Sequence, residues 1–146
     1  MLADGEGHAT SFEVTPDRIH ERPVPADALY WHTNHCLYAD EPCQFEDSFI
    51  RGNRWRELIA TAGVVTIAQL KDWLADSANG SHSICKAPDP ALAHEITWLQ
   101  TLCSIAMDLT DRTLWVSDGL SSRNPYVPFR LCASEPETAT VTRRLV

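Results

Sequence analysis

The stretch Leu29-Tyr30-Trp31-His32-Thr33-Asn34-His35-Cys36-Leu37 joins an aromatic run to a cluster of polar side chains. Residues 28–33 are apolar and aromatic, a composition that favours a short β-strand. Pro23 and Pro25 interrupt the chain just before this run, because proline fixes φ and lacks a backbone donor. The pattern therefore predicts a strand over residues 28–33, with the His-Thr-Asn-His cluster at its end.

Two helices are predicted in the middle of the chain. In residues 51–62 the apolar side chains recur at spacings of three and four, which places them on one stripe of a helix with Gly63 as a C-terminal cap. This stripe holds Trp55, Leu58, Ile59 and Ala62. A second helix is expected to begin after Thr66, since Gln69 follows three residues later as in a capping box. Its apolar face holds Ile67, Leu70 and Leu74.

Strands are predicted at both ends of the chain. Residues 8–14 alternate small, polar and apolar side chains, and residues 15–17 (Thr-Pro-Asp) form a turn signature. Residues 97–109 fit either a helix or a strand, and we favour a strand. It would form a hairpin with residues 114–116, whose Leu-Trp-Val sequence has high β-propensity.

The end of the chain is predicted to be more irregular. Asp118-Gly119 is expected to form a turn. Residues 126–131 form at best an edge strand, because Pro128 cannot donate to a ladder. We assign residues 1–132 to one folded unit and residues 133–146 to a loose tail.

The composition excludes several classes of function. The 146 residues are 44% hydrophobic and 22% charged, as in ordinary globular proteins. The formal charge of −8 disfavours nucleic acid and anionic membranes as partners, since both are negative. The N-terminus has no export signal, and the five cysteines are irregularly spaced without a CxxC, so we expect a cytoplasmic protein.

The polar cluster admits several kinds of chemistry. A zinc site is disfavoured, because in an extended segment His32 and His35 point to opposite faces. His35 is also badly placed to deprotonate the adjacent Cys36. Asn34 is different, because an amide at a strand end can donate N–H to a developing oxyanion. The simpler interpretation of Asn34 is an ordinary turn residue.

Two further groups could take part in a site. One group shares a helical face, because its members are three residues apart: Ser48, Arg51 and Arg54. The simpler interpretation of this group is a solvated first turn of the helix, with Ser48 as its cap. Ser83 and Lys86 follow a Gly-Ser loop, where a hydroxyl and a cation could meet a substrate carboxylate or carbonyl.

Taken in order, these motifs resemble one family. The Leu29–Leu37 stretch, Asp47-Ser48 with Arg51 and Arg54, Ser83-Ile84-Cys85-Lys86 and residues 101–119 are similar to the C-terminal portion of acyl-coenzyme A:6-aminopenicillanic acid acyltransferases and their bacterial relatives. Gly7-His8-Ala9 and Phe12-Glu13 look like the strand that precedes the first motif. The resemblance covers about residues 5–131.

The resemblance implies an α+β fold that is part of an αββα N-terminal-nucleophile hydrolase sandwich, with antiparallel strands. It implies a cysteine, exposed by self-cleavage at a Gly-Cys bond, that attacks a small amide or acyl-thioester and passes the acyl group to water or an amine. Asn34 would help to form the oxyanion hole, and Ser83 and Lys86 would bind the substrate. No cofactor or metal is implied, although acyl-coenzyme A is a possible substrate.

The sequence departs from the family pattern in two ways. Lys86 stands where the family has Arg, which keeps the charge and loses the planar fork. No Gly-Cys pair occurs in the chain, so the nucleophile is expected in a region upstream. The chain is thus expected to be a C-terminal fragment, inactive alone, with exposed sheet surface that a complementary N-terminal half covers. The alternatives are a non-catalytic binding subunit and a small zinc protein.

Overall fold

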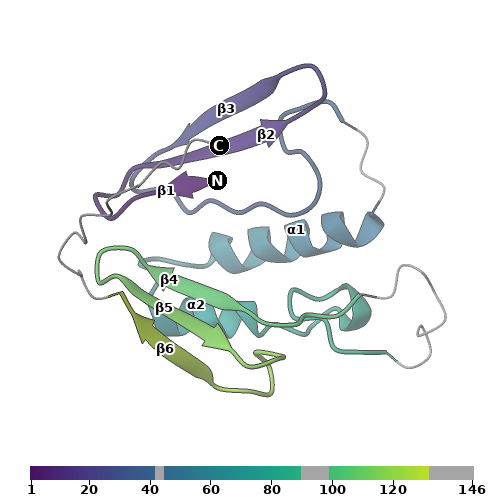
Figure 1. Ribbon diagram of the computed structural model, residues 1–146. Coiled ribbons are helices and arrows are strands. Elements are labelled where there is room, and N and C mark those ends of the chain that lie inside the picture. The colour runs from purple at the N-terminus through teal and green to yellow at the C-terminus, as the bar shows by residue number, and fades with distance from the viewer. Residues whose placement is uncertain (42–44, 90–98, 132–146) are drawn as a thin grey trace, which may run out of the picture.

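The computed structural model describes residues 1–41, 45–89 and 99–131, which fold as a mixed α+β structure (Figure 1). The described residues form two three-stranded antiparallel sheets, ordered β1-β2-β3 and β4-β5-β6, together with two α-helices. In chain order the elements are β1 (Leu2–Ala3), β2 (Ala9–Val14), β3 (Ile19–Val24), α1 (Glu46–Ala60), α2 (Ile67–Leu74), the short 3-10 helix η1 (Gly80–His82), β4 (Ile105–Asp108), β5 (Thr113–Ser117) and β6 (Tyr126–Arg130). The predicted α+β class is confirmed at this level.

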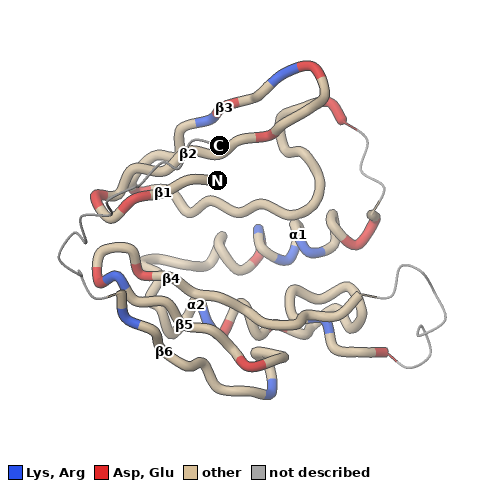
Figure 2. The backbone as a smooth tube through the Cα atoms, viewed as in Figure 1, with Lys and Arg blue, Asp and Glu red and all other residues tan. Residues whose placement is uncertain are grey.

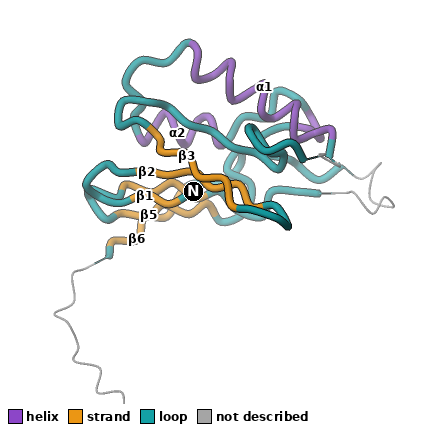
Figure 3. The backbone as a smooth tube through the Cα atoms, turned by 90° about the horizontal axis from the view of Figure 1, so that it is seen from above, coloured by secondary structure: helices purple, strands orange, loops and turns teal. Residues whose placement is uncertain are grey.

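The sheets and helices form two layers. In Figure 1 the two sheets lie next to each other with β1 and β4 as neighbouring edges, and Figure 3 shows both helices on one side of the strands. The turns that follow β1 and β4 touch, because a Cβ on Gly5 would lie 2.9 Å from the carbonyl oxygen of Leu109. One layer of strands is thus backed by one layer of helices.

The first sheet contains a hairpin that was only half predicted. Strand β2 and the turn after it are confirmed, and the Thr15 amide donates to the Arg18 carbonyl at 2.9 Å to close that turn. Strand β3 is not predicted by the sequence pattern, because Pro23 and Pro25 indicate breaks in the chain. Pro23 lies within β3, an edge strand, where one side of the backbone needs no ladder partner.

The second sheet agrees more closely with the sequence pattern. Strands β4 and β5 form the predicted hairpin, and β6 is an edge strand with Pro128 opposite Trp115. Strand β4 is shorter than predicted and begins only at Ile105. Gly119 has a φ of 92°, which glycine adopts without strain, at the predicted turn. Residues 133–146, predicted to be a loose tail, lie outside the described residues.

The strand predicted over residues 28–33 is wrong. These residues form no ladder and run as an irregular segment before a bend at Asn34 and His35. The aromatic side chains that suggested a strand pack elsewhere: the Tyr30 hydroxyl is 2.7 Å from Ser11 Oγ, and the Trp31 ring lies against Gly52 of α1. High β-propensity is misleading here because it reflects side-chain packing, which β2 and α1 supply for these residues.

The two helices are present, with corrections at the ends of α1. It begins at Glu46, five residues early, and Glu46 and Asp47 place negative charge at the positive end of the helix dipole. The expected cap Ser48 is fully buried inside the helix, and the C-cap is Thr61 rather than Gly63. Helix α2 begins as predicted, since the Thr66 side chain accepts a hydrogen bond from the Gln69 amide at 3.2 Å.

Burial divides the second sheet into two unlike faces. The face toward the helices buries small side chains, those of Ser104, Ala106, Thr113 and Ser117. The strand register places one set of apolar side chains from the three strands on the opposite face, here called the bare face: Ile105, Met107, Leu114, Val116, Val127 and Phe129. Met107 and Phe129 are 59% and 53% exposed. Figure 2 shows few charged residues on these strands and more of them at the turns, on β3 and on α1.

Large apolar side chains are missing from the interior of the described residues. The buried apolar residues there are Ala39, Cys85 and Ala106. In the first sheet, Leu2, Val14 and Ile19 are also exposed. The described part of the chain contains no helix that is both long and apolar enough to cross a membrane.

Gly52 allows α1 to approach the aromatic segment closely. A Cβ at this position would lie 2.8 Å from Trp31 Cζ3 and 3.1 Å from His35 Cε1. We expect Gly52→Ala to lower the free energy of unfolding by about 1–3 kcal/mol, although alanine normally stabilises a helix. Urea unfolding measures the change. Gly63→Ala is the control, because a Cβ there meets nothing within 4 Å. Equal stability of the two variants would show that the contact is not tight.

Candidate functional site

A buried carboxylate on β2 holds the segment that follows the His-Thr-Asn-His cluster. Glu13 is 3% exposed. Its carboxylate accepts hydrogen bonds from three successive backbone amides, those of Leu37, Tyr38 (3.2 Å) and Ala39 (2.8 Å). His32 Nε2 lies 3.1 Å from Glu13 Oε1, and since a carboxylate only accepts, this nitrogen donates. We call this arrangement the Glu13 cradle.

The cradle keeps Glu13 ionised. Burial alone raises the pKa of this carboxyl group. The hydrogen bonds from the Leu37 and Ala39 amides and from His32 lower the pKa by more than burial raises it, so the pKa is below its usual value. A charged acceptor makes stronger hydrogen bonds than a neutral one. The loop is therefore attached to the first sheet by one charge.

A second cluster attaches the motif to α1. Ser48 Oγ donates to Thr33 Oγ1 at 3.0 Å, and Thr33 Oγ1 donates to the Ser48 carbonyl at 3.1 Å. His35 Nδ1 is 2.9 Å from both hydroxyl oxygens. Because both hydroxyl protons are already committed, Nδ1 carries a proton and donates. The His35 ring also stacks on Phe49, with centroids 4.2 Å apart.

Asn34 lies at the end of a chain of polar contacts that begins at Lys86. The Lys86 ammonium donates to Asp47 Oδ2, and Arg51 Nη1 is 3.3 Å from the same oxygen. Arg51 Nη2 donates to Asn34 Oδ1 at 2.6 Å. Burial raises the pKa of Asp47, while the Lys86 hydrogen bond and the Arg51 charge lower it more, so its pKa falls below the usual value. The structure thus links Asn34 and Lys86, which are 52 positions apart in the sequence.

The contact with Arg51 fixes the orientation of the Asn34 amide. A guanidinium group has only donors, so the amide oxygen must face it. This leaves the Nδ2 group of Asn34 as the donor end, on an exposed side chain. Such a group is what an oxyanion hole requires.

Ser83 takes a different position from Asn34 and Lys86. It is fully buried, and its Oγ accepts a hydrogen bond from the Asn79 amide at 2.9 Å. The segment after it is held by the Cys85 amide, which donates to the Asp76 carbonyl at 2.8 Å. The Asp76 carboxylate in turn accepts from Arg54 Nε at 3.0 Å and Nη2 at 2.6 Å. Ser83 therefore helps to shape the loop that carries Lys86.

A cavity of about 350 Å³ lies between residues 29–32 and the two helices. Its walls are Leu29, Tyr30, Trp31, His32, Trp55, Ile59, Val65, Leu70 and Trp73. The rings of Trp55 and Trp73 meet edge to face, with centroids 6.1 Å apart and planes at 81°. The Arg56 guanidinium lies 5.5 Å from the Trp31 ring centroid. The aromatic segment thus connects this cavity to Asn34.

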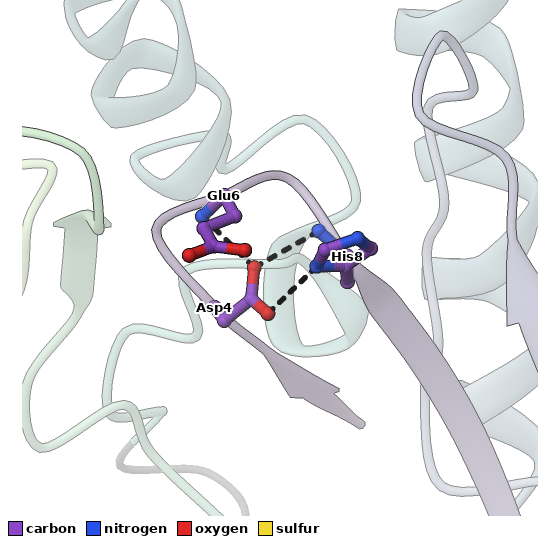
Figure 4. A group of neighbouring side chains, drawn as sticks. All are labelled: Asp4, Glu6 and His8. Atoms are coloured by element: carbon purple, nitrogen blue, oxygen red, sulfur yellow. Dashed lines mark hydrogen bonds and ion pairs between the residues drawn. The ribbon is translucent and has the colours of Figure 1, made fainter.

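One group of side chains in the described residues has the spacing of metal ligands. It consists of Asp4, Glu6 and His8, in the turn after β1 (Figure 4). Asp4 Oδ1 already accepts from the amides of Glu6 (2.9 Å) and His8 (3.0 Å), and Asp4 Oδ2 is 2.9 Å from His8 Nδ1. These contacts close an exposed turn. His32 and His35 belong to no such group within the described residues.

No protein-family model matches this chain, and no curated protein has a significant sequence match to it. Any functional assignment therefore depends on the motifs and on the geometry around Asn34.

Sequence reasoning missed Glu13 and the buried role of Ser48. Glu13 was noted only as part of a strand, and a single acidic residue in an alternating strand gives no sign of burial. The predicted solvated cap at Ser48 is wrong because α1 begins earlier than the apolar pattern indicates, which places Ser48 inside the helix.

The Glu13 cradle should contribute strongly to stability. In Glu13→Gln the charge is lost and the NH₂ group replaces one acceptor, leaving buried amides without a partner. We expect the free energy of unfolding at pH 7 to fall by about 3 kcal/mol. Glu21→Gln, exposed on β3, is the control and should change it by about 0.5 kcal/mol or less. Urea unfolding that gives equal values for both variants would contradict the cradle's role.

His35 should make stability depend on pH below neutrality. Burial, followed by the neighbouring His32, lowers the pKa of His35 below its ordinary 6.5. The unfolded chain then binds the proton more readily, so this stabilisation is complete above about pH 6.5. It is lost as the pH falls toward the folded-state pKa. Unfolding at pH 7.5 and 5.5 should show a larger loss for the natural chain than for His35→Gln, and equal losses would refute the assignment.

Proposed function

We propose that this chain is the C-terminal part of an amide hydrolase or acyltransferase of the N-terminal-nucleophile type. It would act on a small amide or acyl-thioester, acyl-coenzyme A among them, through a cysteine nucleophile that lies outside these 146 residues. The observation that carries the proposal is the Asn34 amide, which Arg51 holds with its donor end available. The order of the motifs, which resembles that of the acyltransferase family, supports it.

The proposed chemistry assigns one step to Asn34. When the cysteine sulfur attacks the substrate carbonyl, negative charge develops on the carbonyl oxygen. Asn34 Nδ2 would donate a hydrogen bond to that oxygen, and one such donor contributes about 3–4 kcal/mol to the transition state. As the oxyanion returns to a carbonyl, the bond to the amine or thiol of the substrate would break, and that group would leave with a proton. Water or an amine would then attack the acyl-cysteine and release the cysteine thiol.

Lys86 and Ser83 have positioning roles in this proposal. The buried ammonium of Lys86 is already paired with Asp47, which also contacts Arg51. Its charge therefore acts on Asn34 through Asp47 and Arg51. Ser83 holds the turn at Asn79 that precedes Lys86. A substrate contact to either residue would require these partners to be released.

The layers of the fold support the αββα part of the proposal. One strand layer backed by one helix layer is half of such a sandwich, and the bare face points away from the helices. A complementary N-terminal half would place its own sheet against this face and bury its apolar side chains.

A second candidate function is favoured by the same surface. A bare apolar face would also suit a non-catalytic binding subunit that pairs with an N-terminal half without taking part in catalysis. In this alternative the chain still associates with an N-terminal half, but Asn34 has no catalytic role. One experiment can therefore distinguish the two candidate functions.

The test is complementation with an N-terminal portion of an acyltransferase-family protein that carries the Gly-Cys junction. We expect the mixture, and neither half alone, to hydrolyse a chromogenic phenylacetyl amide. Asn34→Ala should lower kcat about 100-fold or more. The control is Asn53→Ala on the exposed side of α1, where the amide oxygen accepts a hydrogen bond from Arg56 Nη1 at 2.8 Å.

The outcomes of this assay are distinct. A folded complex with no activity would exclude the enzymatic function and favour the binding subunit. Activity that is unchanged in Asn34→Ala would remove Asn34 from the mechanism. Failure of Phe129→Glu to weaken the association would show that the bare face is not the contact surface.

A further inference from the structure

We propose that the cavity between residues 29–32, α1 and α2 binds a neutral, planar aromatic molecule of one or two rings. Its volume of about 350 Å³ is at the small end of the range of ligand pockets, which is roughly 300–1,000 Å³. This size suits a single small ring system rather than a drug-sized or polymeric ligand.

The arrangement of the walls selects an aromatic guest. Trp55 and Trp73 both line the cavity with their ring planes at 81°, so a flat guest that lies parallel to one ring is nearly perpendicular to the other. Aromatic rings carry a negative face and a positive edge, and a flat guest can satisfy both at once. A saturated chain gains only from the area it buries.

Charge excludes ionic guests. Among the described residues, the cavity walls contain no Asp, Glu, Lys or Arg, and the one histidine there, His32, is already paired with Glu13, so a buried ion would have no free counter-charge. The Arg56 guanidinium already lies over the Trp31 ring, and its positive charge would repel a cation attracted to the same ring. A neutral molecule avoids both costs.

The walls are held in place without a ligand. The Tyr30 hydroxyl is 2.7 Å from Ser11 Oγ, and His32 Nε2 is bound to Glu13. The Trp31 ring packs against the backbone of α1 at Gly52. A preformed cavity avoids part of the ordering cost of binding, because its side chains are already fixed.

Indole is a suitable probe, followed through the tryptophan Nε1–H signals of the ¹⁵N-labelled chain. We expect saturable shifts at Trp55 and Trp73, and little change at Trp115, which is not among the cavity walls. 1-Hexanol and tetramethylammonium should bind at least about tenfold more weakly, a difference that corresponds to about 1.4 kcal/mol. Tight binding of either comparator would overturn the assigned ligand class.

A matched pair of variants tests the location. Ile59→Phe adds volume inside the cavity and should weaken indole binding at least about tenfold. Leu58→Phe, one residue earlier on α1 and not among the cavity walls, should leave it unchanged. Unfolding curves establish that both variants fold, and Val65→Phe, on a different wall segment, serves if Ile59→Phe does not. Indole binding that is the same in the filled and natural proteins would refute the site. This readout needs no catalytic partner, so it is independent of the proposed reaction.

Discussion

The buried carboxylate of Glu13 is the interaction on which the rest of this structure depends. It is the acceptor for three successive amides and for His32, so it attaches the segment after the motif to the first sheet. A buried charge is tolerated only when its partners are in place, which makes the arrangement close to all-or-none. Once residues 37–39 are fixed at one end and Tyr30 contacts Ser11 at the other, the chain between them has little freedom. The position of Asn34 follows from these two attachments.

Helix α1 then determines which way this segment faces. Two small residues make the approach possible: Ser48 is fully buried against His35 and Thr33, and Gly52 has no side chain to keep Trp31 away. The same helix carries Asp47 and Arg51, which continue the polar chain from Lys86 to Asn34. Helix α1 thus lines the aromatic cavity with one set of side chains and orients the Asn34 amide with another. A change in its rotation would alter both.

The features that the sequence predicted are those with local causes. Thr66 caps α2 because its partner Gln69 is three residues away, and Pro128 restricts β6 to an edge because proline lacks a donor. The errors occur where the cause is distant. Residues 28–33 have the composition of a strand, but their side chains contact β2 and α1, and no local pattern reveals these distant partners. Glu13 and Ser48 become buried only when segments far apart in the chain meet. Asn34 and Lys86 were proposed separately, and their connection through Asp47 depends on where α1 begins.

The distribution of polarity supports the association that the proposed function requires. Inside the described residues, the buried positions are mostly polar and small, whereas Met107, Val127 and Phe129 are exposed on the bare face. A chain that folded alone would be more stable with apolar residues in its interior and polar residues on this face, because apolar burial is the main favourable term in folding. The polar interior costs little when its groups are paired, as those of Glu13, His35 and Lys86 are. The apolar exterior is costly until another surface covers it. Both features are those expected of a chain whose bare face is covered in a larger assembly, which is what the proposed function requires.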